Sequence, residues 1–425
     1  MKILRRIIRR IIHFLNGREI RRILSEIKIV PFQGEKRSIV FLNSNYYHFT
    51  YMAEALRRRG WNALTVSIHS QSTTGLKLTT TEDVNLYDEN WIQQARLALQ
   101  FFKNEMPKYH MFVFYGTWCS SFFHLLTKRD GIPLDTAALK EAGHLIGYSY
   151  SGCLDGVRQS VFHHISKGMC EKCVWKDNEQ VCSDAVNSAW KNTLEGMCDL
   201  ISTNGDFVSE DRLGDQYYYD PLLMSLDSEV WSPSIEVPER LLIEKGADEI
   251  VVMTAFANQK QRSLGNKDVK GSFFIRDAIE RLIAKGYKIK PIYLNDIPQM
   301  DMPYVQVQAD IYIDQLNYGV FGASAHQALM LGLPLITNFH VKFAENKAHM
   351  HFCAEDVPVV HATEETVFAQ LESLINDEAR RNELGRQARE FAMKWYDSDV
   401  CAERFEKIYD LMITGKKVSE LRDIV

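Results

Sequence analysis

The sequence of 425 residues contains no run of about eighteen or more apolar residues, so no segment is expected to span a membrane by itself. It also lacks an excess of positive charge, because 50 lysine and arginine residues stand against 55 aspartate and glutamate residues, for a formal net charge of −5. This balance argues against a general nucleic-acid binder. The chain has 46% hydrophobic and 25% charged residues, which is ordinary for a soluble globular protein.

A strongly basic segment stands at the N-terminus. From Met1 to Lys28, apolar residues recur at helical spacing with arginines between them, which predicts an amphipathic helix. Its apolar residues are interrupted too often for a secretory signal. On anionic lipid, each basic side chain near the surface adds on the order of 1 kcal/mol. We expect residues 1–30 to bind an anionic membrane surface, peripherally, at the cytoplasmic face of the cell membrane. The alternative is a helix docked on the protein's own body.

Past Pro31 the sequence alternates short buried strands with helix-length segments. A chain this long exceeds what one hydrophobic core normally supports, so two domains are expected. Strands separated by helix-length connections predict a parallel sheet covered on both faces, with ligands at the carboxyl ends of the strands. In the first half the predicted strands are 38–42, 63–66, 111–115, 145–149 and 200–203, and the predicted helices include 47–59 and 89–103.

A second unit of the same kind follows a proline-spaced segment at 231–238. Its first predicted strand is 249–254, followed by a helix over 272–285 that closes at Gly286 and a strand at 289–294. The final part of the chain reads as helices, including 383–396 and 400–414. The sequence therefore predicts two α/β units in succession.

The most informative segment of the second unit runs from Ala309 to Thr337. It reads as a buried strand, a glycine-rich turn, a helix of small residues and a second buried strand. Gly319 and Gly322 let backbone N–H groups approach a ligand closely where the next helix starts, which is how a protein holds a phosphate without a charged side chain. The predicted ligand is a nucleotide diphosphate, and the alternative is an ordinary strand-to-helix loop.

This segment resembles the donor-binding region of glycosyltransferase group 1, the family 4-like retaining enzymes with the GT-B fold. The match covers 309–322, 327–330 and 332–336, and the resemblance is strongest over 249–337. It implies an α/β protein of two Rossmann-like, doubly wound domains facing a cleft. The implied parts are an acceptor domain at 36–232, a donor domain at 240–395 and helices at 396–425 that cross back onto the first domain. Trp395, Tyr396, Phe405 and Tyr409 are the aromatic residues expected to dock that crossing, and the alternative is that they are plain core of the second domain.

The resemblance also implies the donor site. A Lys-Gly pair precedes the helix at 272–285, and Lys270 is the candidate for contact with the donor pyrophosphate, with Arg262 and Lys267 as rivals. The alternative is that Lys270 is a solvated residue at the start of the helix. Two glutamates of the family fall here on Gly319 and Gln327. An amide can still accept hydrogen bonds from a ribose, although more weakly than a carboxylate. The implied donor-binding residues are Gly319, Val320, Phe321, Gly322, Lys270, Arg262 and Gln327.

Chemistry is expected in the cleft between the domains. Lys270 and the glycine turn would stabilise negative charge on the leaving diphosphate, and the family's retaining mechanism requires neither a dedicated carboxylate base nor a catalytic metal. His48 is a candidate on the acceptor side, so the catalytic candidates are Lys270, Gln327 and His48. Further acceptor-side candidates, each also readable as a turn or capping residue, are Asn43, Asn45, Tyr115, Thr117, Tyr148, Tyr150, Asp155, Asn204 and Asp206. His326, next to Gln327, is interpreted as a packed residue.

Four of the eight cysteines fall in the pattern C-x16-C-x2-C-x8-C, inside an insertion at about 153–198. A Cys-x-x-Cys pair places two thiolates on one turn at a spacing suited to tetrahedral zinc, and two flanking cysteines would complete a structural site. His163 and His164 are alternative ligands. The other interpretation is a set of reduced, partly buried thiols, because a cytoplasmic setting disfavours disulfides. The predicted zinc ligands are Cys153, Cys170, Cys173 and Cys182.

Together these features predict a membrane-peripheral glycosyltransferase that moves a sugar from a nucleotide-diphosphate sugar to a cell-surface glycan, such as lipopolysaccharide or capsule, or to a lipid-linked precursor. A catalytically inactive homologue that binds sugar or nucleotide as a partner protein is the alternative favoured by the replaced glutamates. A sugar-nucleotide epimerase is a second alternative, although it would be expected to bring more carboxylates and histidines to the cleft.

Overall fold

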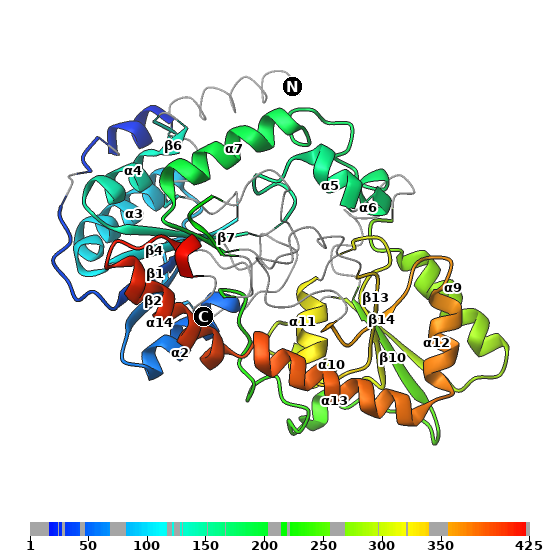
Figure 1. Ribbon diagram of the computed structural model, residues 1–425. Helices are drawn as coiled ribbons and strands as arrows, with labels where there is room; N and C mark the ends of the chain where they lie inside the picture. Colours follow the sequence, from blue (N-terminus) through cyan, green and yellow to red (C-terminus); the bar gives the residue numbers. More distant parts are fainter. Residues whose placement is uncertain are drawn as a thin grey trace.

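The computed structural model describes residues 17–23, 25–27, 30–42, 47–68, 82–116, 121–122, 128–129, 131–150, 152–165, 167–202, 214–218, 222–255, 268–295, 297–319, 322–339 and 356–421. These residues form two α/β domains, each built on its own parallel sheet (Figure 1). The fold class expected from the alternation of strands and helices is therefore confirmed.

The first domain contains a seven-stranded sheet with the order β3-β2-β1-β4-β7-β8-β9, in which neighbouring strands run parallel. Its central strands are apolar runs buried on both faces, as expected of a sheet covered by helices. The strands are β1 (Ser38–Leu42), β2 (Asn62–Ser67), β3 (Val84–Asn85), β4 (Met111–Tyr115), β7 (Leu145–Ser149), β8 (Leu200–Ser202) and β9 (Tyr217–Tyr218).

Helices cover this sheet, and some of them begin at a side chain that caps their first amides. Asn90 accepts hydrogen bonds from the N–H groups of Ile92 and Gln93 at the start of α3, and Ser183 caps α7 in the same way. A short antiparallel pair, β5 (Lys128–Arg129) with β6 (Ile132–Pro133), lies beside α4 and α7. The helices are α2 (His48–Arg58), α3 (Trp91–Glu105), η1 (Met106–Lys108), α4 (Leu134–Glu141), α5 (Gln159–Ile165), α6 (Lys167–Glu171) and α7 (Asp184–Met197).

The second domain contains a five-stranded parallel sheet with the order β11-β10-β12-β13-β14. One apolar cluster packs on each of its faces, and β10 and β12 contribute alternate residues to the two clusters. The strands are β10 (Ile250–Ala255), β11 (Ile289–Leu294), β12 (Ile311–Ile313), β13 (Leu335–Thr337) and β14 (Val360–His361). The helices are η4 (Glu239–Leu241), α9 (Ser272–Ala284), α10 (Met302–Gln306), α11 (Ala323–Met330), α12 (Val367–Ile375), α13 (Glu378–Trp395), α14 (Ser398–Met412) and η8 (Val418–Leu421).

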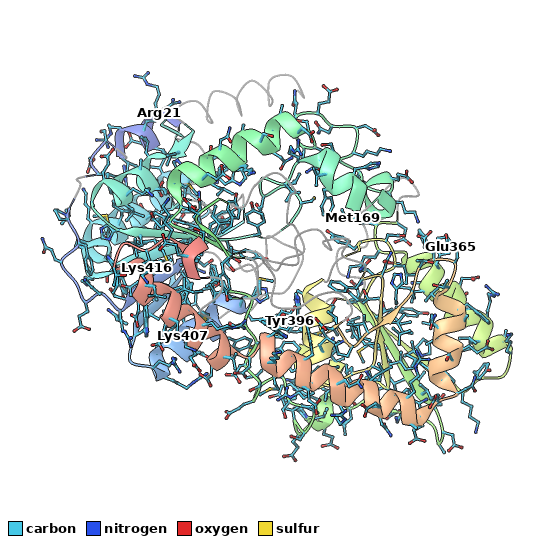
Figure 2. All side chains as sticks on the ribbon, in the orientation of Figure 1. Arg21, Met169, Glu365, Tyr396, Lys407 and Lys416 are labelled. Atoms are coloured by element: carbon cyan, nitrogen blue, oxygen red, sulfur yellow. The ribbon has the colours of Figure 1, made fainter. Side chains whose placement is uncertain are left out.

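The end of the basic N-terminal segment packs on the first domain. Residues 17–23 are helical, and Ile20 and Ile23 are buried in the core of that domain. Glu19 pairs with Arg96 of α3 at 3.4 Å, while Arg21 is exposed at the outer surface (Figure 2). Residues 1–16, which carry most of the predicted amphipathic helix, lie outside the described residues. Within the described ranges, no helix is both long enough and apolar enough to cross a bilayer.

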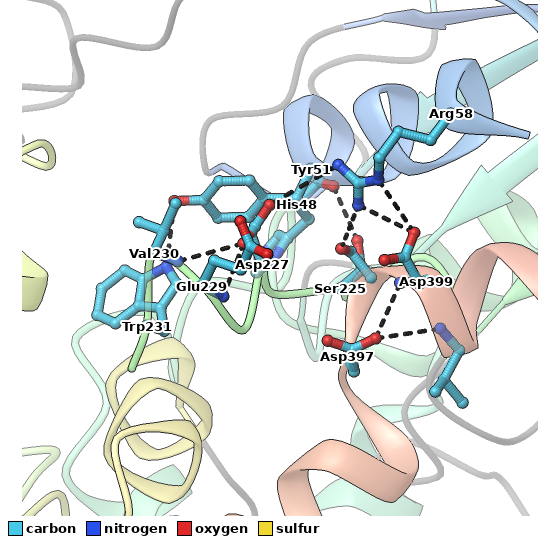
Figure 3. Close-up of polar contacts among 12 residues, drawn as sticks. His48, Tyr51, Arg58, Ser225, Asp227, Glu229, Val230, Trp231, Asp397 and Asp399 are labelled. Atoms are coloured by element: carbon cyan, nitrogen blue, oxygen red, sulfur yellow. Dashed lines mark hydrogen bonds and ion pairs between the residues drawn. The ribbon is translucent and has the colours of Figure 1, made fainter. Parts of the chain in front are cut away.

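The chain passes between the domains twice, and the two crossings are hydrogen-bonded to each other. The Leu226 N–H donates to the Tyr396 carbonyl at 2.7 Å, and the Ser398 N–H donates to the Leu226 carbonyl at 2.8 Å. Figure 3 shows the polar residues at this junction, where Arg58 of α2 pairs with Asp399 at 2.9 Å and the Trp231 indole N–H donates to the Tyr51 hydroxyl at 3.1 Å.

Beyond the second crossing, α14 packs on the first domain. Phe405 and Tyr409 are buried in a cluster with Phe49 and Trp61, whereas Trp395 and Tyr396 belong to the core of the second domain. The Glu406 carboxylate accepts a hydrogen bond from the Trp61 indole at 2.7 Å. The aromatic residues at the end of the chain are therefore divided between two cores.

Candidate functional site

A buried carboxylate organises the carboxyl edge of the second sheet. Asp314 follows β12 directly, and its side chain has no solvent exposure. It accepts hydrogen bonds from the Ser324 hydroxyl at 2.7 Å and from the Gly322 N–H, at the start of α11, at 3.2 Å. The Lys270 ammonium lies 3.3 Å from the same carboxylate. Asp314 thus occupies the anion-binding position that a helix N-terminus offers.

The charge of Asp314 is maintained by these partners. Burial by itself would raise the pKa of the carboxyl group, but the Lys270 ammonium and the hydrogen bonds from Ser324 and Gly322 outweigh burial and lower the pKa below its usual value. The lysine and the aspartate therefore form a buried ion pair with no net charge. A phosphate at this edge would need positive charge in addition to Lys270.

The turn that carries Lys270 is fixed against the loop after β12. The Leu316 N–H donates to the Lys270 carbonyl at 2.9 Å. Gly271 has a φ of +75°, and a Cβ atom there would lie 2.9 Å from the Leu316 Cβ, so this position needs glycine on both counts. Lys270 therefore reaches the carboxyl edge of β12 because the backbone approaches closely at Gly271.

Amide side chains join the loops that follow β12 and β13. The Gln315 side-chain amide donates to the Thr337 hydroxyl at 3.1 Å and to the Asn338 carbonyl at 2.8 Å. Asn338 in turn donates from its side chain to the Leu316 carbonyl at 2.7 Å. All of these side chains are buried. The edge is therefore a fixed polar surface at the place where parallel sheets bind ligands.

The structure describes some of the predicted donor residues and not others. Gly319 has a φ of +75° and pairs with Phe339, which accounts for a glycine at this turn. Gly322 and Lys270 come together, but both have Asp314 as a partner, a contact that the sequence analysis did not anticipate. Val320, Phe321, Arg262 and Lys267 lie outside the described residues. Diphosphate binding at this turn stays a prediction.

His48, His326 and Gln327 lie at the junction of the domains. The side chains of His48, at the start of α2, and of His326, on α11, are both buried. Burial, followed by the charge of His326, lowers the pKa of His48 to about 3. Burial also lowers the pKa of His326 to about 4, against the opposing effect of Asp314. His326 packs on Tyr396 with ring centroids 4.5 Å apart, and Gln327 is buried beside it. The interpretation of His326 as a packed residue agrees with this contact.

On the acceptor side, the described candidates are held inside the first domain. The Tyr148 hydroxyl donates to Asp155 at 2.8 Å, and Asp155 also accepts from the Gly152 N–H at 3.1 Å. Tyr115, Tyr148, Tyr150 and Asp155 are all buried. These contacts are those of core and turn residues. Asn43, Asn45, Thr117, Asn204 and Asp206 lie outside the described residues.

The four clustered cysteines are free thiols that lie close enough to affect one another. Burial, and then the neighbouring thiols Cys182 and Cys173, raise the pKa of Cys170 to about 12. Burial, and then the thiols of Cys170, Cys173 and Cys182, raise the pKa of Cys153. Cys182 donates to the Gln159 side-chain oxygen at 3.0 Å. Among the described residues, however, no group of three or more His, Cys, Asp or Glu side chains is arranged to hold a metal ion. The predicted structural zinc site at Cys153, Cys170, Cys173 and Cys182 is therefore not supported.

No protein-family model matches this sequence, and no curated protein matches it. Solved structures do share its fold. The catalytic domain of starch synthase IV from Arabidopsis thaliana, bound to ADP and acarbose, is 11% identical with a TM-score of 0.55, and the match covers 90% of this chain and all of that one. Sucrose-phosphate synthase from Thermosynechococcus elongatus is 13% identical with a TM-score of 0.52 over 90% of this chain and 100% of its own.

A third similar structure is that of Anabaena HepE in complex with UDP-glucose, which is 12% identical with a TM-score of 0.50 over 89% of this chain and 99% of its own. These likenesses extend over both domains. The chain therefore has the GT-B fold.

Sequence reasoning did not identify several residues at the carboxyl edge of the second sheet. Asp314 and Gln315 follow a buried strand directly, without an intervening turn residue. Polar residues at the carboxyl end of a parallel strand are frequent ligand-site residues, so the sequence did contain a signal for this pair. Asn338 has the same position after β13. Glu364 carried no such signal, because its contacts come from segments far away in the sequence.

Proposed function

We propose that this protein is a glycosyltransferase that transfers a sugar from a nucleotide-diphosphate sugar to an acceptor glycan or a lipid-linked glycan precursor. Because a fold does not determine function, the proposal depends on the site. The observation that carries it is a lysine turn fixed at the carboxyl edge of the second sheet, on a GT-B fold matched over 90% of the chain. The nucleotide complexes of starch synthase IV and HepE support a nucleotide-sugar donor.

In the proposed reaction, the bond between the anomeric carbon of the donor sugar and the phosphate oxygen breaks, and the acceptor hydroxyl forms the new bond. Negative charge then builds up on the leaving diphosphate, which a fixed ammonium group stabilises. Asp314 positions Lys270 for this role but also neutralises its charge. We therefore propose that Arg262 or Lys267, in the segment leading to the same turn, supplies the additional positive charge.

We propose that residues 36–232 bind the acceptor, that residues 240–395 bind the donor, and that the configuration of the transferred sugar is retained. A retaining reaction in which the leaving phosphate helps to deprotonate the acceptor is compatible with the absence of a glutamate at Gly319. The arginine-rich segment before residue 17 supports peripheral binding at the inner face of the cell membrane, and with it a glycan or lipid-linked acceptor of the cell surface.

A thermal-shift screen with uridine, guanosine, cytidine and adenosine diphosphates, followed by transfer assays with the matching nucleotide sugars, tests the proposal. A ligand present at about 100 times its Kd stabilises the folded protein by roughly 2.7 kcal/mol, which is readily measured. We expect one nucleotide to raise the unfolding temperature and its sugar conjugate to support transfer. The double variant K270M/D314N, which removes the lysine without leaving an unpaired charge, is expected to lose this effect. Absence of any nucleotide binding would refute the proposal.

The different-class alternative is an inactive homologue that binds a nucleotide or sugar as a partner protein. The residues Gly319 and Gln327, in place of the family's glutamates, favour this alternative. It predicts nucleotide binding without hydrolysis or transfer, even when the native acceptor is supplied. A sugar-nucleotide epimerase would instead convert the donor sugar without any acceptor, which analysis of the sugar products distinguishes from transfer.

A further inference from the structure

The cysteine-rich insertion of the first domain reaches across to the second domain. Figure 1 shows α5 and α6 beside the second domain, at the side remote from α14. Met169 of α6, labelled in Figure 2, is buried, and Val269 and Tyr318 of the second domain pack against the same apolar cluster. At Gly168 an added Cβ atom would lie 3.5 Å from the Asn317 side-chain oxygen. The insertion therefore packs close to the loop that follows β12.

An ion pair joins the insertion to the second domain at this contact. Lys172, just beyond α6, pairs with the carboxylate of Glu364, which follows β14. The Glu364 side chain is only 12% exposed, so the pair is better shielded from solvent than a surface salt bridge. The Lys172 ammonium also lies 5.4 Å from the centre of the Phe274 ring on α9. Both partners of Lys172 therefore belong to the second domain.

The same carboxylate connects this ion pair to the turn that carries Lys270. The Asn317 side-chain amide donates to Glu364 at 2.8 Å and to the Asp268 carbonyl at 3.1 Å. Asp268 begins the turn that ends at Gly271, whose N–H donates to the Asp268 carbonyl at 3.2 Å. A continuous set of polar contacts thus leads from Lys172 of the first domain to the proposed donor-binding turn.

The insertion is held firmly enough to position Lys172. The Gln159 side chain donates to the Cys153 carbonyl at 2.9 Å and accepts from Cys182 at 3.0 Å, which ties the start of the insertion to the segment after α6. The Ser160 hydroxyl donates to Asp184 at 2.6 Å, which fixes α5 to the start of α7. Lys172 lies between these tied segments and is therefore presented at a defined place.

We propose that Lys172 and Glu364 are positioning residues that close the cysteine-rich insertion onto the second domain and, through Asn317, order the 268–271 turn for donor binding. The proposed ordering of the turn does not depend on any activity of the protein. Its effect on turnover depends on the glycosyltransferase activity proposed above. Without the ion pair, the turn is expected to open more often and the donor to bind less tightly, because only the ordered state is competent.

The test compares K172Q, E364Q, the double variant K172Q/E364Q and the charge exchange K172E/E364K with two controls. K176Q removes an exposed lysine from the same insertion, and E378Q removes an exposed glutamate at the start of α13. Hydrogen exchange of the amides at 268–275 and 316–318 reports on the turn, and donor KM and kcat report on its use. Melting temperature serves to identify any variant that is simply unfolded.

We expect amide exchange at the turn and donor KM to rise roughly 3- to 10-fold in each single substitution, with kcat less affected. The double variant should be no worse than either single one, because both break the same contact. The charge exchange restores an ion pair between the domains but is not expected to restore the turn, because the Asn317 NH2 group donates to both Glu364 and the Asp268 carbonyl, and a lysine at position 364 cannot accept from it. The two controls should match the wild type in every measurement.

Unchanged exchange at the turn in K172Q and E364Q would overturn the proposal, as would a charge exchange that restores wild-type exchange at the turn, because the link through Asn317 would then be unnecessary. The exchange measurement needs neither nucleotide nor acceptor, so it stays decisive if the protein proves to lack transferase activity. Conversely, a protein that transfers sugar but shows no effect of these substitutions on the turn would leave the proposed function intact and refute the positioning role.

Discussion

Asp314 and Lys270 depend on each other because both charges are largely removed from water. The aspartate side chain is fully buried, and the lysine side chain is 13% exposed. Breaking such a pair by removing one partner leaves an uncompensated buried charge, whereas removing both partners leaves neutral groups. Stability and the proposed donor binding can therefore be separated at this pair by the choice of substitutions.

The variant K270M is expected to lower the free energy of unfolding by about 3 kcal/mol, because Asp314 loses its counter-charge. The double variant K270M/D314N should recover most of this loss, since the asparagine oxygen can accept from the Gly322 N–H while its amide group donates to the Ser324 hydroxyl oxygen. Urea denaturation of the three proteins measures the effect. If K270M proves as stable as the wild type, the pair is not the buried contact described above.

At the scale of elements, the backbone of α13 lies so close to the turn after α11 that no side chain fits between them. A Cβ atom at Gly385, in the middle of α13, would lie 2.4 Å from the Gly332 carbonyl oxygen. Gly332 has a φ of +68°, which favours glycine at the end of α11. The contact between the two elements thus depends on a glycine from each of them.

Gly385→Ala is expected to destabilise the protein by roughly 1–3 kcal/mol, because the helix must move away from Gly332. The matched control is Gly196→Ala, a solvent-exposed position in α7 where the nearest atom to an added Cβ lies at 3.7 Å. There the same substitution should stabilise by roughly 0.5–1 kcal/mol through helix propensity. Thermal and urea denaturation measure both changes, and equal signs for the two substitutions would contradict this account.

The elements themselves were largely predictable from local sequence. The predicted strands 38–42, 111–115, 145–149 and 289–294 coincide with β1, β4, β7 and β11, because short apolar runs between helix-length segments have few other interpretations. Helix boundaries were less well predicted. Helix α13 begins at Glu378 rather than at 383, since its first turn is charged and capped by Asp377 instead of being marked by apolar residues.

The candidate site was less predictable than the fold. The glycines and Lys270 were identified by a local motif, but Asp314 as their partner was not, because its role depends on where α11 begins in space. The contact of Lys172 with Glu364 joins residues 192 positions apart in the sequence. No local pattern specifies such a contact, because it depends on how an insertion in one domain meets a loop in the other.

At the scale of the whole molecule, the interface between the domains buries two histidines that are held neutral. The pKa of His48 is about 3 and that of His326 about 4, both below the ordinary value of 6.5. The unfolded chain therefore binds more protons than the folded one as the pH falls below 6.5. Both histidines contribute stability that is present above pH 6.5 and lost on acidification through that range.

We expect the double variant H48N/H326N to show a shallower loss of stability between pH 6.5 and 4 than the wild type, by an amount on the order of a few kcal/mol at pH 4. Asp135 has the opposite effect on the pH dependence of stability, because burial raises its pKa to about 6. The difference between the stability profiles of the variants is therefore more informative than any single profile. The exposed His361 provides the control variant H361N. Parallel profiles for all three proteins would contradict the expected linkage.

The return of α14 to the first domain determines how the protein can be divided into fragments. A gene truncated after the second domain would leave Trp61 and Phe49 without the apolar face of Phe405 and Tyr409, and its product is expected to aggregate. The second domain could be excised as one contiguous segment, whereas the first domain must be assembled from two separate segments of the chain. Splitting the protein into soluble halves therefore requires a short loop to rejoin Leu226 with Ser398, whose backbones already meet.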